Sequence, residues 1–212
     1  LMSLLTRDLL AERVARDIPP GAVVNLGIGI PTAISNYLAE DRHVVLHTEN
    51  GMLGMGPEAQ GDLIDTDLTN AGKIPVTEMA GASYFHHAES FAMMRGGHLD
   101  VCVLGAYQVA SNGDLANWLT TSAEAIPAVG GAMDLAIGAK SLWVMMDLLT
   151  KEGQSKVVSE CTYPLTGLGC VSRIYTDHAV FDLNAGQLDL VEAFDGHNST
   201  TLSAIIGLPV YD

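Results

Sequence analysis

Basic side chains are scarce in this sequence. Lysine and arginine together number 10 of 212 residues, against 25 aspartates and glutamates, which gives a formal net charge of -15 at pH 7. A surface of that sign repels phosphate backbones and anionic lipid at long range. We therefore expect neither nucleic acid nor a membrane surface among the partners, and ordinary solubility is the simplest reason for the acidity.

Cysteine is also rare, and the three cysteines follow no ligand pattern. Cys102, Cys161 and Cys170 are odd in number, widely spaced and free of any Cys-x-x-Cys motif. This spacing indicates neither a disulfide framework nor a zinc site. The adjacent pair His86-His87 also lacks a third ligand at metal-site spacing. The sequence therefore predicts reduced thiols and no bound metal.

The sequence contains no long uninterrupted hydrophobic run. No apolar stretch approaches the roughly 18 residues that span a bilayer, and residues 1–18 lack the basic start and cleavage site of a secretory signal. With 48% hydrophobic and 17% charged residues, the composition is typical of a compact globular protein. We expect a cytoplasmic protein that forms one domain over residues 1–212.

Short apolar segments alternate with helical patterns along most of the chain. Strands are predicted at residues 22–26, 44–47, 73–79, 99–107 and 141–149, and helices within residues 1–18, at 32–40, at 86–97 and from 130 onward. After residue 155, two segments flanking the turn at 184–187 predict a closing C-terminal β-hairpin. Continuously apolar strands that alternate with helices indicate an α/β fold: an open, largely parallel sheet with helices on both faces.

A single acidic residue, Glu49, ends the second predicted strand and is followed at once by Asn50 and Gly51. Ligands of parallel sheets bind beyond the carboxyl ends of the strands, where this carboxylate is expected. An ordinary strand-end acid is one interpretation. Gly51, Gly54 and Gly56 favour a functional one, because glycine lets the backbone approach a ligand closely.

Two kinds of chemistry are open to Glu49. A general acid of a sugar-cleaving site needs a second carboxylate at a defined separation, and the acids at 58, 62, 65 and 67 follow no such spacing. A nucleophile needs only to be ionised, which an unperturbed carboxylate is at pH 7. The sequence therefore predicts that Glu49 is a nucleophile that attacks an acyl carbon.

Attack on an acyl carbon requires hydrogen-bond donors for the oxyanion that develops. Gly130 and Gly131 come just before a predicted helix, where free backbone N–H groups are expected. Asn25, at the end of the first strand, offers a side-chain amide. The following GIGIP turn, residues 27–31, begins like a dinucleotide fingerprint but has Thr32 at the third glycine position, so a tight strand-to-helix turn is an equal interpretation.

Five segments together are similar to one protein family. In order, they are ENGMLGMGP (49–57), RGGHLDVCVLGAYQV (95–109), GDLANW (113–118), VGGAMDL (129–135) and CTYPLTG (161–167). They resemble the B (beta) subunit of the family I 3-oxoacid CoA-transferases, and the likeness runs from about residue 7 to about residue 195. It implies the open α/β fold that CoA-transferases share with sugar-phosphate isomerases. It also implies a companion A subunit, expected as an A2B2 heterotetramer.

The resemblance implies roles for several residues. Glu49 matches the nucleophile of the family, with Asn50 and Gly51 in the same motif, Gly131 matches an oxyanion N–H donor, and Asn25 lies in the same site. The implied reaction moves CoA from succinyl-CoA to a 3-oxoacid through a glutamyl-CoA thioester, so no cofactor is expected beyond the CoA substrate. Relatives often have histidine where this chain has Leu148.

The acceptor acid and its contacts are less determined. The resemblance is strongest to the transferases that act on 3-oxoadipate in aromatic catabolism, and acetoacetate is the alternative acceptor. A sugar-phosphate-binding regulatory module on the same fold, in which Glu49 holds a ligand hydroxyl, is an alternative of another class. Gly96 and Gly97 are candidates for binding CoA, and His86 and His87 for binding the distal carboxylate of the acceptor.

Overall fold

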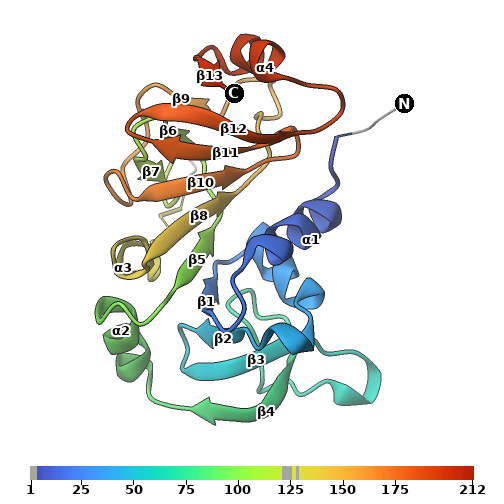
Figure 1. Cartoon of the computed structure of the whole chain (residues 1–212). Helices are drawn as coiled ribbons and strands as arrows, with labels where there is room; N and C mark the ends of the chain where they lie inside the picture. Colours follow the sequence, from blue (N-terminus) through green and yellow to red (C-terminus); the bar gives the residue numbers. More distant parts are fainter. Residues whose placement is uncertain (1–3, 121–125, 128) are drawn as a thin grey trace.

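One long sheet runs through the molecule and positions every other element (Figure 1). The structure is a computed structural model that describes residues 4–120, 126–127 and 129–212. Its strands are β1 (Val23–Leu26), β2 (Val45–Thr48), β3 (Met52–Glu58), β4 (Val76–Tyr84), β5 (Val101–Leu104), β6 (Gln108–Ala110), β7 (Leu115–Ala116), β8 (Ser141–Met145), β9 (Val157–Val158), β10 (Val171–Tyr175), β11 (Ala179–Asn184), β12 (Gln187–Ala193) and β13 (Val210–Tyr211). Its helices are α1 (Arg7–Asp17), α2 (His87–Arg95), α3 (Ala132–Gly138) and α4 (Ser199–Ile206), with 3-10 helices η1 (Ile30–Tyr37), η2 (Glu40–Arg42) and η3 (Gly61–Leu63).

The centre of the long sheet is parallel. Within the described residues its strands follow the order β13-β12-β11-β10-β8-β5-β1-β2-β3-β4, and the five strands from β10 to β2 are parallel to one another. Antiparallel pairs join β3 and β4 at one edge and β11 and β12 at the other. The predicted largely parallel sheet is thus confirmed at the centre, where all four residues of β5 are buried.

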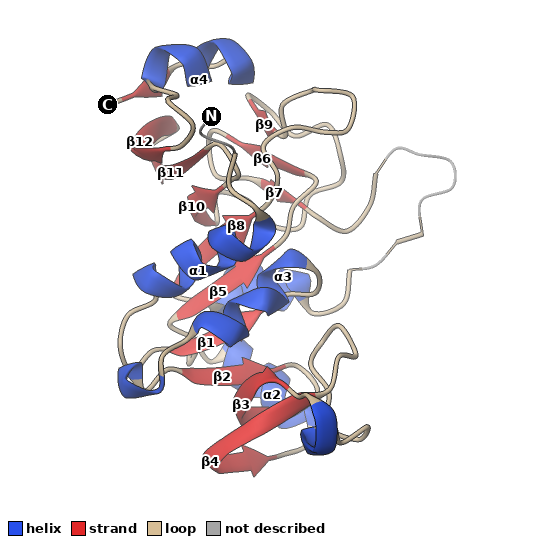
Figure 2. Ribbon diagram, turned by 90° about the vertical axis from the view of Figure 1, so that its right-hand side faces the viewer, coloured by secondary structure: helices blue, strands red, loops and turns tan. Residues whose placement is uncertain are grey.

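Helices cover both faces of the central strands, as the sequence predicts. One face packs against α1 and η1, and the other packs against α2, α3, α4 and a small sheet of β7, β6 and β9. Figure 1 shows α1 on one side of β5 and β8, with α2 and α3 on the opposite side. Figure 2 shows the twist of the sheet from β4 at the bottom to β12 near the top.

The N-terminal helix follows its sequence pattern closely. Thr6 caps α1 by accepting a hydrogen bond from the Leu9 N–H group. Leu10, Val14 and Ile18 are almost fully buried, because their spacing places them on one face of the helix. The prediction of an amphipathic first helix is confirmed.

Several predicted boundaries and one helix type are wrong. The predicted helix at 32–40 is the 3-10 helix η1, which begins earlier, with Pro31 in its first turn. The strand predicted at 99–107 ends at Leu104, where the chain turns into the cavity described below. The closing hairpin predicted around residues 184–187 is confirmed as β11 and β12, and β10 extends it to a three-stranded antiparallel unit. Its second turn has positive φ at both Ala185 and Gly186, as in two-residue hairpins.

The final segment, whose packing the sequence does not predict, adds to the sheet. Asn198 caps α4 by accepting the Thr201 N–H, and Gly207 ends that helix in the left-handed conformation. The chain then returns as β13, parallel to β12. Leu202 of α4 is fully buried in the core.

The glycine-rich segment after Glu49 is a strand, which overturns one argument from the sequence. Residues Met52–Glu58 form β3 between β2 and β4. A Cβ atom at Gly51 would lie 2.1 Å from the Phe85 carbonyl oxygen, and one at Gly56 would lie 2.4 Å from Thr77 Oγ1. These glycines therefore let β3 approach β4 and its flanking residues, rather than a ligand.

The cysteines and the helix lengths bear on two further expectations. Cys102, Cys161 and Cys170 are all free thiols, as predicted. In the part of the chain that the structure describes, every helix is too short or too polar to reach across a bilayer.

Candidate active site

A cavity of about 310 Å³ opens at the carboxyl ends of the central strands. Its walls are formed by residues 27–30 after β1, residues 104–107 after β5 and the end of β8, with residues 129–132 before α3. Glu49, which follows β2, also lines this cavity. The structure thus places the predicted nucleophile where parallel sheets bind their ligands.

The Glu49 carboxylate is bound by a backbone N–H group from a distant part of the chain. The Gly131 nitrogen donates to Glu49 Oε1 at 3.0 Å, although the two residues are 82 positions apart. Burial raises the pKa of Glu49 above its ordinary value, and the Gly131 hydrogen bond and the charge of His87 oppose that rise. The carboxylate is therefore half-buried, oriented and more basic than a free glutamate.

The approach of Gly131 to Glu49 leaves no room for a side chain. A Cβ atom at Gly131 would lie 2.2 Å from Glu49 Oε1 and 3.1 Å from Phe91 Cζ. The Phe91 ring in turn contacts the ring of His87, with 4.7 Å between centroids. The structure therefore brings three distant residues together: Gly131 before α3, His87 at the start of α2 and Glu49 at the end of β2.

A buried hydrogen-bond chain lies beneath Glu49. Asn25 Nδ2 donates to the His47 carbonyl oxygen at 3.1 Å and approaches His47 Nδ1 at 3.0 Å. Ser90 Oγ lies 3.0 Å from His47 Nε2 and donates to the Thr48 carbonyl oxygen at 3.0 Å. Because the amide nitrogen only donates, His47 Nδ1 accepts and Nε2 carries the proton. The chain holds the end of β2, from which Glu49 projects.

The side-chain amide of Asn25 is bonded to His47, so it is not free to donate to an oxyanion in this structure. Both hydrogens of its amide are directed at His47, and its side chain is 2% exposed. Asn25 lies near Glu49, because both line a small pocket beside the end of β2. In this structure Asn25 supports the strand end through His47, and a direct role with the substrate stays a prediction.

Acidification is expected to destabilise the fold through His47. Burial lowers the pKa of His47 from its ordinary value of 6.5 to about 4. Between these values the unfolded chain binds more protons than the folded one, so stability is present above pH 6.5 and is lost as the pH falls toward 4. The loss attributable to this group is about 3 kcal/mol by about pH 4.

Denaturant unfolding across this pH range, for the wild type and His47→Gln, measures that contribution. The variant is expected to show a shallower pH dependence than the wild type. His98→Gln, at an exposed histidine, is the matched control and should retain the wild-type slope. An unchanged slope in His47→Gln would show that the buried imidazole does not carry the effect.

The other residues of the Glu49 motif have structural contacts. Asn50 is exposed, and its Nδ2 donates to the Thr69 carbonyl oxygen at 3.3 Å. Gly51 adopts a φ of 113° in the turn from β2 to β3. Gly130 lines the cavity with a φ of 48°, and no atom lies within 4 Å of the position that a Cβ would take. Substrate contacts of Asn50, Gly51 and Gly130 stay predictions.

The remaining predicted site residues lie at the two ends of helix α2. His86 caps the helix, because its Nδ1 accepts the Ala88 N–H and its own N–H donates to the Glu89 side chain. Gly96 and Gly97 lie at the opposite end of the helix from His87, and neither lines the Glu49 cavity. Their roles in binding CoA and the acceptor stay predictions, with His87 the member of this group that lies near Glu49.

Sequence reasoning missed three polar residues of this region: His47, Ser90 and Lys156. A signal existed for His47, because a polar residue inside an apolar strand is unusual unless it has a partner. Ser90 and Lys156 give no such signal, since an isolated serine in a helix and a lysine in a loop are ordinary. Across the described ranges, no group of three or more His, Cys, Asp and Glu side chains is placed to hold a metal ion.

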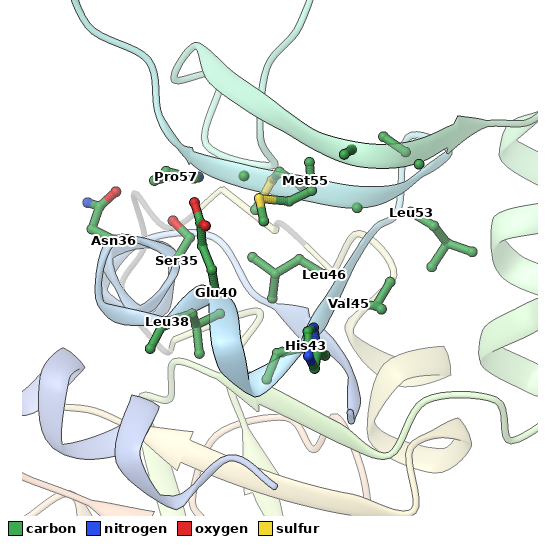
Figure 3. Close-up of a pocket in the computed structure, with 18 residues that line it drawn as sticks. Ser35, Asn36, Leu38, Glu40, His43, Val45, Leu46, Leu53, Met55 and Pro57 are labelled. Carbon is green, nitrogen blue, oxygen red and sulfur yellow. The ribbon is translucent and has the colours of Figure 1, made fainter. Parts of the chain in front are cut away.

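A second cavity, of about 350 Å³, lies away from Glu49 (Figure 3). It is formed by η1 and η2 on one side and by β2, β3 and β4 on the other. Leu46 extends toward its centre in Figure 3, and Glu40 lies beside Ser35. None of the predicted site residues lines it, apart from glycines of β3.

Comparison with known proteins identifies the family. A family model described as Coenzyme A transferase matches residues 7–194. The chain belongs to the coenzyme A transferase family. The B subunit of a 3-oxoadipate CoA-transferase of Pseudomonas putida is 57% identical over 206 residues, which are 97% of this chain and 96% of that protein. The B subunit of a probable succinyl-CoA:3-ketoacid coenzyme A transferase of Bacillus subtilis is 48% identical over 190 residues, covering 90% and 88% of the two chains.

A solved structure agrees with this assignment at the level of the fold. An acyl-CoA transferase of Escherichia coli O157:H7, crystallised as the apoenzyme, superposes with a TM-score of 0.73 at 22% identity. The match covers 100% of this coenzyme A transferase chain and 43% of that chain. The present chain therefore spans less than half the length of that relative, whereas it spans nearly all of the Pseudomonas protein.

The motifs that carry the family resemblance converge on the Glu49 cavity of this coenzyme A transferase. Four of the five segments line it, through Glu49, residues 104–107, Asn117 and residues 129–132. The fifth, CTYPLTG, supports the cavity wall, because Thr166 Oγ1 donates to Asn117 Oδ1 at 2.6 Å. Leu148, where the sequence departs from the expected family pattern, is fully buried in the core and does not line the cavity.

Proposed function

We propose that this chain is the B (beta) subunit of a CoA-transferase that moves CoA from succinyl-CoA to 3-oxoadipate. The observation that carries the proposal is the Glu49 carboxylate, half-buried in a cavity and bound at 3.0 Å by the Gly131 N–H group. The 57% identity to the B subunit of a 3-oxoadipate CoA-transferase supports the choice of acceptor.

The first half of the proposed reaction transfers CoA to the enzyme. A Glu49 oxygen attacks the succinyl carbonyl carbon, the C–S bond of the tetrahedral adduct breaks, and CoA leaves as a thiolate, so that a mixed anhydride of Glu49 and succinate forms. The thiolate then attacks Glu49 Cδ, succinate departs, and a glutamyl-CoA thioester remains.

The second half of the proposed reaction transfers CoA to the acceptor. The carboxylate of 3-oxoadipate attacks the glutamyl-CoA thioester, and the same steps in reverse deliver 3-oxoadipyl-CoA and free Glu49.

The Gly131 N–H group has a defined place in this sequence. It donates to an oxygen of Glu49 itself. When CoA thiolate attacks Glu49 Cδ, negative charge develops on a Glu49 oxygen, where this donor stabilises it. A donor of this kind lowers the activation barrier by about 3 kcal/mol. The donor thus acts on intermediates centred on the Glu49 carbon, rather than on the oxyanion of the incoming acyl group that the sequence analysis considered.

The proposal includes a partner and a compartment. Relatives are named as B subunits, so we propose a companion A subunit that completes the CoA site in an A2B2 heterotetramer. One thioester replaces another, so the bonds and electrons balance without ATP or a redox cofactor. Three free cysteines suit a reducing compartment such as the cytoplasm.

The acceptor is tested by direct comparison. With the assembled A and B subunits and succinyl-CoA as donor, kcat/KM for 3-oxoadipate is expected to exceed that for acetoacetate by at least about tenfold, a discrimination within the range of single pocket contacts. Thioester absorbance of each product provides the measurement. Preference for acetoacetate would change the acceptor assignment, and a lack of exchange with either acid would contradict the proposed function.

A further inference from the structure

Lys156 lines the Glu49 cavity and carries a positive charge without a side-chain partner in the described ranges. The residue is half-buried. Among the described residues, its ammonium group has no ion pair or side-chain hydrogen bond. Burial lowers the pKa of Lys156, which shows that its charge is costly here. A cation held in a cavity without a partner favours an anionic ligand.

The acidic residues near Lys156 have other partners. Asp147 and Asp177 act on its charge at a distance. However, Asp147 Oδ2 pairs with Arg7 Nη2 at 2.7 Å, and Asp177 Oδ1 accepts the Leu148 N–H at 2.8 Å. The charge of Arg7 also acts on Lys156 and lowers its pKa. Both carboxylates are thus engaged elsewhere, which leaves the Lys156 ammonium without a direct partner in the part of the chain described.

The backbone of Lys156 is fixed across the cavity from Glu49. Its N–H donates to the Leu148 carbonyl oxygen at 2.9 Å, just beyond β8, and its carbonyl oxygen accepts the Val109 N–H at 3.0 Å. Strands β1 and β5 separate β8 from β2, whose end holds Glu49. Three strand spacings correspond to about 14 Å between the backbones. Side chains from both ends and a short acyl group together can span that distance.

The wall between the two charged residues is mostly apolar. Leu104, Leu135, Met145 and Met146 line it. Such a wall suits the methylene chain of an acyl group, with a reacting thioester at one end and a charged group at the other. The cavity therefore matches a dicarboxylic acyl chain better than a polar nucleotide.

We propose that Lys156 binds the free carboxylate at the far end of the dicarboxylic acyl substrate, while the thioester carbonyl lies at Glu49. This inference rests on the proposed function and deepens it. Lys156 is then the residue that distinguishes dicarboxylic from monocarboxylic acyl groups. The sequence predicts this role for His86 and His87, which lie at the start of α2 outside the lining of the cavity.

The test compares succinyl-CoA with its monomethyl ester, which has the same chain without the terminal charge. The rate of CoA-adduct formation on Glu49 is measured in the assembled enzyme at low acyl-CoA concentration. The wild type is expected to favour the free acid by about 100-fold, the range of a buried charged contact. Lys156→Met should reduce that preference to nearly one, mainly by slowing the reaction of succinyl-CoA.

Matched controls separate the outcomes. Lys151→Met removes an exposed lysine of the preceding turn and should keep the wild-type preference. An equal loss for both substrates in Lys156→Met would overturn the proposal, because it would place Lys156 on CoA or on a shared step. An unchanged preference would also overturn it. Absence of any adduct in the wild type would instead show that the proposed function has failed, and this inference with it.

Discussion

The Glu49→Ala variant of the assembled enzyme is expected to lose turnover by about 10⁴-fold or more, since loss of a covalent nucleophile removes the reaction path itself. The half-buried carboxylate, its position in the cavity and its hydrogen bond to Gly131 all support this expectation. The alanine side chain fits the site without a clash, so the fold should be retained. The free energy of unfolding is therefore expected to change much less than the rate.

Two measurements check this prediction. The first is steady-state transfer from succinyl-CoA. The second is mass mapping of a CoA adduct, expected on the Glu49 peptide of the wild type and missing from the variant. Glu58→Ala, at an exposed carboxylate in β3, is the matched control and should retain activity. Full turnover by Glu49→Ala, or an adduct on another peptide, would refute the nucleophile.

The Gly131→Ala variant is expected to lower kcat by about 100- to 1000-fold, the effect of removing one oxyanion donor. The added Cβ would lie 2.2 Å from Glu49 Oε1. Because real Cβ contacts are never so short, either the carboxylate or the loop must move. Both movements break the hydrogen bond and misplace the nucleophile, while the glycines proposed for CoA at the far end of α2 keep their places.

The expected result is therefore a fall in kcat with little change in the KM for succinyl-CoA. Steady-state kinetics and thermal unfolding of the assembled enzyme provide the measurements. Gly186→Ala is the control for the loss of a glycine, because it lies in the β11-β12 turn with a φ of 86° and open space around it. It should reduce stability by about 1 kcal/mol without affecting kcat. Normal kcat in Gly131→Ala would mean that the observed N–H contact is not used.

The central strands and the place of Glu49 could be predicted from the sequence because their signals are local. Each strand of the parallel core is a short apolar segment that requires burial on both faces. The boundaries were less predictable. The strand expected at 99–107 ends early because residues 104–107 line the cavity, and the type of η1 depends on how it packs against the sheet.

The glycines after Glu49 have a different role from the one that the sequence suggests. The sequence predicts that they leave space for a ligand, but at Gly51 and Gly56 that space is filled by Phe85 and by residues of β4 such as Thr77. The pairing of β3 with β4 joins residues separated by the loop that contains η3. No pattern within the glycine segment itself specifies that partner.

The sequence by itself determined the alternation of strands and helices, the position of a carboxylate at a strand end and the family resemblance. These depend on residue type and local spacing, which a linear chain carries. Only the tertiary structure decided that Gly131 binds Glu49, that Asn25 and Ser90 hold His47, and that Lys156 faces the same cavity. Such contacts join residues far apart in the chain, and their geometry exists only after the sheet has brought its strand ends to one edge.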